Sequence, residues 1–190
     1  MRKREAVAAP HADRQHGHVN INLRLLTGQP CEMAALQKVL ERAPTYVERV
    51  TGRPPGAEEA KLLFSALPPE MTYDNKYVYG LLFLAGGPED MIGCADVIRS
   101  WPTPSTALIS LLLLDEAHQG HGLGRSTYHL VEEKVRRWPE IDTLRISVVR
   151  SNVAVLPFWR RMGFAETGEV RPYVYDKIVS ESIILTKSLR

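Results

Sequence analysis

The chain has little cysteine, little net charge and no long hydrophobic run. Two cysteines in 190 residues, Cys31 and Cys94, are too few for a disulfide framework or a cluster of metal ligands. Their small or apolar neighbours indicate buried side chains. A net charge of +2 is too small to indicate binding to nucleic acid or a membrane surface. No segment approaches the roughly 20 apolar residues of a membrane span. We therefore expect no nucleic-acid, membrane or metal partner.

Residues 1–18 are mostly polar and contain no long apolar run. The segment lacks the apolar core of a signal peptide, so we expect a cytoplasmic protein. Its histidines are irregularly spaced and have no carboxylate cluster beside them, which argues against a metal site. We expect residues 1–18 to form a disordered tail and residues 19–190 to form a single domain. The sequence is compatible with a homodimer.

Hydrophobic periodicity predicts seven strands with helices between them. The strands are expected at Val19–Leu26, Lys76–Ala85, Met91–Arg99, Leu108–Leu114, Leu144–Val149, Phe164–Thr167 and Ser182–Leu189. The helices are expected at residues 30–43, 45–50, 58–67, 123–138 and 155–162. This order predicts an α/β (α+β) fold in which a central mixed sheet carries helices on both faces.

An apolar strand that leads into a glycine-rich turn is the most informative feature of the sequence. Leu108–Leu114 is followed by a polar turn and then by Gln119-Gly120-His121-Gly122-Leu123-Gly124, after which a helical pattern begins. Glycines at a helix start leave backbone N–H groups bare, and the helix dipole adds roughly half a positive charge that favours phosphate. The segment therefore predicts a phosphate-binding turn. The alternative is a glycine-rich helix start that serves packing alone.

Two common phosphate-binding motifs do not fit this turn. The glycines at positions 120, 122 and 124 lack the spacing of the Gly-x-Gly-x-x-Gly dinucleotide fingerprint, and the strand before them comes fourth rather than first. A P-loop would end in Gly-Lys-Ser/Thr, and this turn does not. The turn therefore indicates a phosphate-containing ligand of another class.

A second segment, one strand beyond the turn, combines an asparagine, an aromatic pair and a final Gly-Phe, at Asn152, Phe158, Trp159, Gly163 and Phe164. The glycine-rich turn matches the pattern Arg/Gln-x-x-Gly-x-Gly/Ala at Gln119, Gly122 and Gly124. Together the two segments resemble the GNAT superfamily of acyl-CoA-dependent N-acetyltransferases. The resemblance extends over the element order from Val19 to Leu189. It implies the GNAT fold, with a mostly antiparallel seven-stranded sheet and splayed central strands, and acetyl-CoA as co-substrate without a metal.

The resemblance also implies where acetyl-CoA binds. The pyrophosphate is expected against the backbone N–H groups of the glycine-rich turn, and the pantetheine arm against the edge of the preceding strand. Asn152 is expected to hold the pantetheine end, and Phe158 to pack beside the arm. The implied cofactor-binding residues are Leu112, Leu113, Leu114, Gln119, Gly120, His121, Gly122, Leu123, Gly124, Arg125, Asn152 and Phe158.

The implied chemistry is direct attack of a neutral amine on the thioester carbonyl, which calls for a base and is helped by an acid. Asp96, in an apolar strand, is the candidate base; the alternative is a polar residue on an exposed sheet face. Asp115 and Glu116 are interpreted as part of a solvated turn. Trp159 stands where the family most often has a tyrosine, and an indole cannot deliver a proton. The acid is then water, Tyr173, Tyr175 or Ser151.

Among these Tyr173 is the candidate acid. Residues 171–175 are expected to form a loop between the last two strands, and the resemblance implies that this loop borders the acceptor site; the alternative is a loop whose aromatic side chains cover the sheet edge. The expected acceptor is a primary amine of a small or amino-acid-like molecule. A protein N-terminus or a lysine side chain is the alternative within the family. A non-catalytic module that binds or senses acyl-CoA is the alternative on the same fold.

Overall fold

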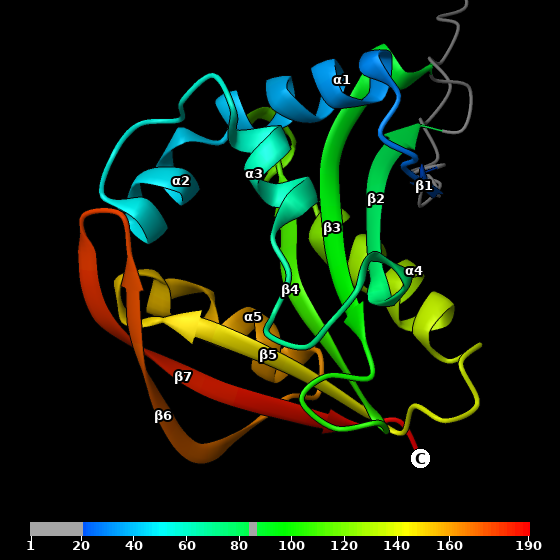
Figure 1. Cartoon of the computed structure of the whole chain (residues 1–190), viewed down its shortest axis with the longest axis vertical. Coiled ribbons are helices and arrows are strands. Elements are labelled where there is room, and N and C mark those ends of the chain that lie inside the picture. Colours follow the sequence, from blue (N-terminus) through cyan, green and yellow to red (C-terminus); the bar gives the residue numbers. More distant parts are fainter. Residues whose placement is uncertain (1–20, 84–86) are drawn as a thin grey trace, which may run out of the picture.

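The computed structural model describes residues 21–83 and 87–190, so the predicted tail at residues 1–18 lies outside the described residues. The sheet has seven strands in the order β1-β2-β3-β4-β5-β7-β6 (Figure 1). All neighbouring strands are antiparallel except β4 and β5, which are parallel. The prediction of a mixed, mostly antiparallel sheet is confirmed. The strands are β1 (Ile21–Leu25), β2 (Lys76–Phe83), β3 (Met91–Arg99), β4 (Thr106–Leu114), β5 (Thr143–Val149), β6 (Ala165–Tyr175) and β7 (Ile178–Ser188).

Helices cover both faces of the sheet, as the order of elements predicts. They are α1 (Pro30–Glu41), α2 (Pro44–Thr51), α3 (Glu59–Ser65), α4 (Leu123–Val135) and α5 (Leu156–Arg161). The side chains of α1 and α3 pack with Val78, Cys94 and Leu111 on one face, whereas α4 and α5 pack with Ala95, Ile109 and Ile146 on the other. In the described part of the chain, no helix is long and apolar enough to cross a membrane.

Local interactions account for the ends of the first two helices. Pro30 starts α1, where its missing N–H costs no hydrogen bond. The carboxylate of Glu32 accepts hydrogen bonds from the backbone N–H groups of Thr27 (2.8 Å) and Gln29 (3.2 Å), which anchors the start of α1. α2 ends at Gly52, whose φ of 77° is the left-handed conformation that glycine adopts without strain.

The two parallel strands in the middle of the sheet separate soon after they meet. β4 and β5 pair only from Thr106 to Leu108, while β5 stays paired with β7 over its whole length. On its other side, β4 pairs with β3 through a bulge, because the register moves from Val97↔Ile109 to Asp96↔Leu111 and leaves Ser110 without a partner. A bulge bends its strand and increases the local twist. The edge of β4 that faces β5 is therefore unpaired beyond Leu108.

The last two strands are longer than the sequence pattern indicates. β6 and β7 form an antiparallel hairpin that turns at Asp176, so residues 171–175 belong to a strand and the prediction of a loop there is wrong. Most side chains of β6 are exposed, which removes the alternation that marks a half-buried strand. Pro172 is tolerated because β6 lies at the sheet edge. Cys94 is buried as expected, but Cys31 is exposed.

Candidate active site

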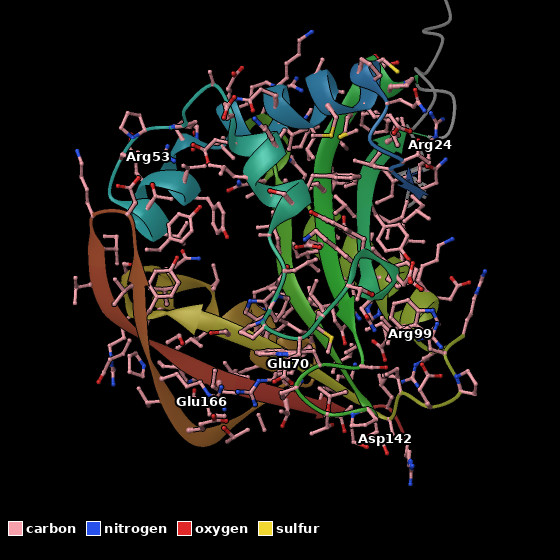
Figure 2. All side chains as sticks on the ribbon, in the orientation of Figure 1. Arg24, Arg53, Glu70, Arg99, Asp142 and Glu166 are labelled. Carbon is pink, nitrogen blue, oxygen red and sulfur yellow. The ribbon has the colours of Figure 1, made fainter. Side chains whose placement is uncertain are left out.

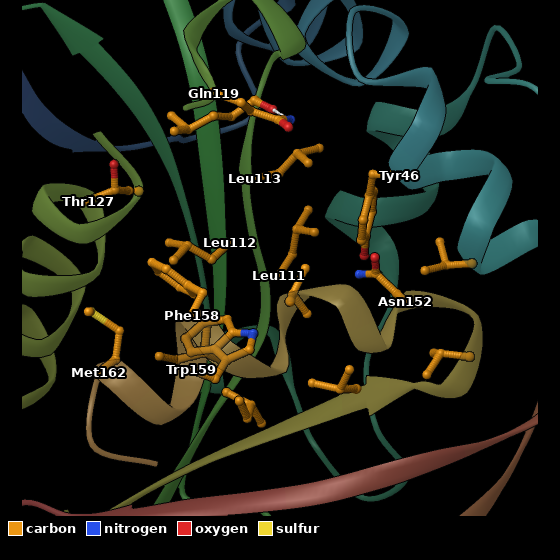
Figure 3. A pocket seen from close by; sticks show the side chains of 18 of the residues that line it. Tyr46, Leu111, Leu112, Leu113, Gln119, Thr127, Asn152, Phe158, Trp159 and Met162 are labelled. Atoms are coloured by element: carbon orange, nitrogen blue, oxygen red, sulfur yellow. Dashed lines mark hydrogen bonds between the residues drawn. The ribbon is translucent and has the colours of Figure 1, made fainter. Parts of the chain in front are cut away.

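The separation of β4 and β5 opens into a cavity of about 890 Å³. Its walls come from both strands, from the glycine-rich turn and the start of α4, from the stretch Asn152–Met162 that includes α5, and from α2 on the opposite face. Figure 3 shows Leu111, Leu112 and Leu113 along the β4 side, with Phe158 and Trp159 facing them. The cavity therefore passes through the sheet at the gap between the two strands. The two sequence motifs are brought together at this gap.

The glycine-rich turn presents bare backbone at one end of the cavity. Gly120 and Gly122 have φ values of 80° and 81°, and a Cβ built on either would meet no atom within 4 Å. Gly122 caps α4, so the first N–H groups of the helix are free for an external acceptor. The side-chain amide of Gln119 donates a hydrogen bond to the carbonyl of Leu114 (2.8 Å), which fixes the turn to the end of β4. This arrangement suits a phosphate.

Asn152 and Phe158 line the middle of the cavity from the element that follows β5. Asn152 lies in a 3-10 helix, η4 (Arg150–Val155), where its Oδ1 accepts a hydrogen bond from Arg49 on α2 at 3.4 Å. The ring of Phe158 lies 3.5 Å from the position a Cβ would take on Gly124, so α5 contacts the start of α4 there. Asn152 and Phe158 therefore lie between the glycine-rich turn and α2, beside the unpaired edge of β4.

Trp159 belongs to an aromatic cluster that borders the cavity. Its ring packs edge-on against Tyr128, Phe158 and Phe164, with centroid distances of 6.1, 5.0 and 5.3 Å. Only 8% of the residue is exposed. The indole nevertheless lines the cavity. The indole ring therefore packs in the core and also faces the cavity. Its single N–H can donate a hydrogen bond but does not titrate.

Asp96 is buried beside the bulge of β4, so the alternative of an exposed sheet residue is wrong. Its Oδ2 accepts hydrogen bonds from Lys76 Nζ (2.7 Å) and from Ser110 Oγ (2.6 Å). Its Oδ1 is buried and has no partner within the described part of the chain. Burial raises the pKa of Asp96, and this effect exceeds the opposing influence of Lys76 and Ser110. Asp96 does not reach the cavity wall, but Ser110 does.

Tyr173 enters the cavity from β6 and closes it against α2. Its hydroxyl donates a hydrogen bond to the carbonyl of Val50 at 2.9 Å. Burial, and secondarily the neighbouring Tyr175, raises the pKa of Tyr173 to about 12. Tyr46 also lines this end, and burial raises its pKa above the ordinary value. In Figure 3 the hydroxyl of Tyr46 points toward the side chain of Asn152.

Comparison with known families agrees with this geometry. Residues 34–164, more than half of the chain, match the model of the acetyltransferase (GNAT) family. The chain belongs to the GNAT family. It is an acyltransferase, and acetyl-CoA-dependent N-acetylation is the general reaction of this family. No curated protein matches the sequence significantly.

Solved GNAT structures share the fold at low sequence identity. An acetyltransferase from Thermus thermophilus is 21% identical, with a TM-score of 0.66 over 90% of this chain and 97% of the other. Spermidine N-acetyltransferase from Vibrio cholerae, in complex with CoA and spermine, is 13% identical, with a TM-score of 0.66 over 89% and 95%. The ribosomal-protein-S18-alanine N-acetyltransferase from Escherichia coli is 17% identical, with a TM-score of 0.61 over 89% and 94%. One fold thus serves both small-molecule and protein acceptors.

Most residues that the GNAT motifs single out lie at the cavity, but some do not. Among the implied cofactor residues, His121 and Leu123 are the two that do not line it. His121 is exposed, and the side chain of Leu123 is buried beneath the turn.

Asp115 is not part of a solvated turn: it is 1% exposed and accepts a hydrogen bond from the backbone N–H of His118 at 3.2 Å.

Sequence reasoning missed the residues that approach the GNAT cavity from the opposite face. Tyr46, Arg49 and Val50 of α2 line it, as does Ser110. Ser110 stands within a strand that reads as apolar, and a single polar residue there is a weak signal. The segment of α2 carries no motif, because only the docking of α2 on η4 and on the β6–β7 hairpin brings it to the cavity.

Proposed function

We propose that this chain transfers an acetyl group from acetyl-CoA to the primary amine of a small, amino-acid-like acceptor. The observation that carries the proposal is a single cavity that joins the glycine-rich turn, the unpaired edge of β4 and the polar groups below α2. Such a cavity allows a cofactor to enter from the α4 side and an amine from the α2 side. The thioester and the amine then meet where β4 and β5 separate.

The proposed cofactor contacts follow from the groups along this path. The backbone N–H groups of residues 120–124 and the guanidinium of Arg125 bind the pyrophosphate, while the backbone N–H groups of Gln119 and Arg125 donate to the carbonyls of Glu116 and Gly122. The edge of β4 at residues 112–114 pairs with the amides of the pantetheine arm, as an added strand would. Phe158 packs against the arm, and the side-chain amide of Asn152 binds its thioester end. Backbone N–H groups of β4 near the bulge polarise the thioester carbonyl.

Proton removal from the acceptor is proposed to run through Ser110 to Asp96. Ser110 Oγ accepts the proton of the ammonium while its own proton passes to Asp96 Oδ2, 2.6 Å away. The raised pKa of Asp96 makes its carboxylate a stronger base than an exposed aspartate. Lys76 Nζ, 2.7 Å from Oδ2, favours the ionised form of that carboxylate, in opposition to the effect of burial. The neutral amine then attacks the carbonyl carbon and the C–S bond breaks with its electron pair on sulfur. The second proton of the amine leaves the nitrogen as the amide forms and goes to the departing thiolate, which gives the free CoA thiol.

Departure of the thiolate is proposed to be assisted by Tyr173. A free thiol has a pKa of about 8.5, so a tyrosine with a pKa of about 12 stabilises the departing sulfur by hydrogen bonding more than by full proton transfer. To do so, the hydroxyl of Tyr173 turns from the carbonyl of Val50 toward the cavity. Trp159 supplies packing and one N–H donor on the side of the cavity formed by α5.

The test combines a binding and a turnover measurement on the purified chain. Acetyl-CoA is expected to raise the melting temperature, because a ligand of the native state must stabilise it. Release of free CoA thiol is then followed with small amines, amino acids and peptides. No stabilisation by saturating acetyl-CoA would overturn the cofactor site. Stabilisation without thiol release for any acceptor would favour a module that senses acyl-CoA.

A further inference from the structure

Unpaired arginines are concentrated at the cavity. Ten arginines in the described part of the chain lie within 4.0 Å of a carboxylate oxygen. The arginines that pair with no carboxylate of the described residues are Arg24, Arg49, Arg125 and Arg161. Of these, Arg49, Arg125 and Arg161 line the cavity, and none of the described aspartates and glutamates does. A cavity with this charge is complementary to anionic ligands.

These cationic side chains approach the cavity from two faces of the sheet. Arg125 lies in the first turn of α4 and Arg161 at the end of α5, on the face where the phosphate-binding turn lies. The phosphates of CoA account for cations on that face. Arg49 belongs to α2, which lies on the opposite face with α1 and α3, as Figure 1 shows. A separate anion is therefore needed to explain Arg49.

Arg49 is held at the cavity without being neutralised. Its backbone carbonyl accepts a hydrogen bond from Ser151 Oγ at 2.5 Å, and its guanidinium donates to Asn152 Oδ1 at 3.4 Å. The charge of Arg49 does act on one acid, Glu116. Hydrogen bonds from Thr45 lower the pKa of Glu116 most, and the charge of Arg49 lowers it further. Glu116 forms no ion pair with Arg49. Most N–H donors of this guanidinium thus remain available.

Neighbouring arginines behave differently. Arg42, Arg53 and Arg150 flank the same region, and each pairs with a carboxylate of the chain itself. Their charges serve the fold, because they join elements that are distant in the sequence. Arg49 is the exception among them, and it is the one whose side chain lines the cavity.

We infer that the acceptor carries a carboxylate next to its primary amine, as an α-amino acid does, and that Arg49 binds this carboxylate. The inference rests on the proposed function. A guanidinium binds a carboxylate through two parallel hydrogen bonds, which fixes the direction of the rest of the molecule. Since the amine and the carboxylate of an α-amino acid share one carbon atom, a carboxylate held beside Asn152 presents the amine to the gap between β4 and β5. Polyamines lack this anion and meet no carboxylate among the described residues of the cavity wall.

The first test compares acceptors that differ only in this group. Each amino acid of a panel is assayed beside its amide and its decarboxylated amine, for example L-leucine, L-leucinamide and 3-methylbutylamine. We expect kcat/KM to be at least about tenfold higher for the preferred amino acid than for its two partners, since a charge-assisted contact is lost in both. Equal or better turnover of the amides or amines would overturn the inference and leave the proposed function intact.

The second test changes the arginine. Arg49→Gln leaves a shorter, neutral side chain that stays polar but lacks the positive charge and the paired N–H donors of a guanidinium. We expect its KM for the amino acid to rise by about tenfold or more, with KM for the decarboxylated amine and Kd for acetyl-CoA within about twofold of wild type. Arg24→Gln is the matched control, because Arg24 is also unpaired with any described carboxylate but lies on β1 away from the cavity (Figure 2).

The outcomes separate the inference from the function on which it rests. A rise in Kd for acetyl-CoA that matches the rise in KM in Arg49→Gln would assign Arg49 to the cofactor and overturn the inference. An equal effect on amino acids and decarboxylated amines would also overturn it. If acetyl-CoA binds but neither amino acids nor amines release thiol, the proposed function itself fails, and the acceptor inference fails with it.

Discussion

Gly122→Asp is the sharpest test of the phosphate-binding turn, because the structure separates its electrostatic effect from its effect on folding. Gly122 has a φ of 81°, and a Cβ at this position meets no atom within 4 Å. The substitution therefore causes no clash, and its folding cost is the strain of a left-handed residue, about 1–2 kcal/mol. Gly168 has a φ of 82° and the same open surroundings, but lies outside the cavity. Gly168→Asp is thus a matched control.

The expected effect on binding follows from Coulomb's law. A carboxylate about 5 Å from one unit of pyrophosphate charge, at an effective dielectric constant of about 20, is repelled by about 3 kcal/mol. This corresponds to a loss of affinity of about 200-fold, at 1.4 kcal/mol for each factor of ten. Gly122→Asn has the same shape without the charge, so we expect its affinity to fall by no more than about tenfold.

Isothermal titration with acetyl-CoA measures the three dissociation constants, and urea unfolding measures the three stabilities. We expect Gly122→Asp and Gly168→Asp to lose similar stability, within about 1 kcal/mol of each other, and only the first to lose affinity. The loss should shrink at high salt, since exposed charges are screened. A dissociation constant for Gly122→Asp within threefold of that for Gly168→Asp would refute the assignment of the turn to the pyrophosphate.

Three further predictions concern Ser110 at the cavity wall and the buried carboxylates of Asp96 and Glu132. Ser110→Ala is expected to lower kcat by about 100-fold at unchanged affinity for acetyl-CoA, because the amine loses its route to Asp96; a kcat within threefold of wild type would remove Ser110 from the reaction. Asp96→Asn is expected to lower the free energy of unfolding in urea by about 3–5 kcal/mol, because Lys76 becomes an unpaired buried charge, and a second change, Lys76→Met, should restore most of it; no recovery in the double variant would contradict this account. Burial raises the pKa of Glu132, but hydrogen bonds, the strongest from Lys187, lower it below its ordinary value of 4.5. The ionised form therefore stabilises the fold above pH 4.5, and this contribution is lost as the pH falls through the lowered pKa. Glu132→Gln should thus reduce the free energy of unfolding more at about pH 7 than at about pH 2.5, and an equal loss at both would argue against the ion pair.

Much of the fold could be predicted because its signals are local. The central strands are apolar runs bounded by turn residues, and β3 begins and ends at the predicted residues, Met91 and Arg99. The β6–β7 hairpin was predicted only in part, at Phe164–Thr167 and Ser182–Leu189, for the opposite reason. Its outer strand, β6, packs few side chains into the core, so its sequence lacks the apolar–polar alternation of a half-buried strand.

Burial of individual carboxylates was the least predictable property of the site. Asp115 begins the polar turn after the apolar run Leu111–Leu114, yet it is buried and caps the short 3-10 helix that follows it. Asp96 lies among apolar residues and is buried with Lys76, which is 20 positions away. A buried carboxylate needs a cation or N–H donor that reaches it, and that partner can lie far away in the sequence, as Lys76 does for Asp96 and Arg42 for Asp115.

The sequence by itself determined the strand–turn–helix at residues 108–135 and the second segment at Asn152–Phe164, and these were sufficient for the family. Glycine conformations, caps and apolar periodicity act over a few residues, so a single sequence carries them. Only the tertiary structure decided that α2 lies across the cleft. The hydrogen bond from Arg49 to Asn152 joins residues 103 positions apart. Contacts at such separation depend on how elements pack, and the acceptor end of the site consists of such contacts.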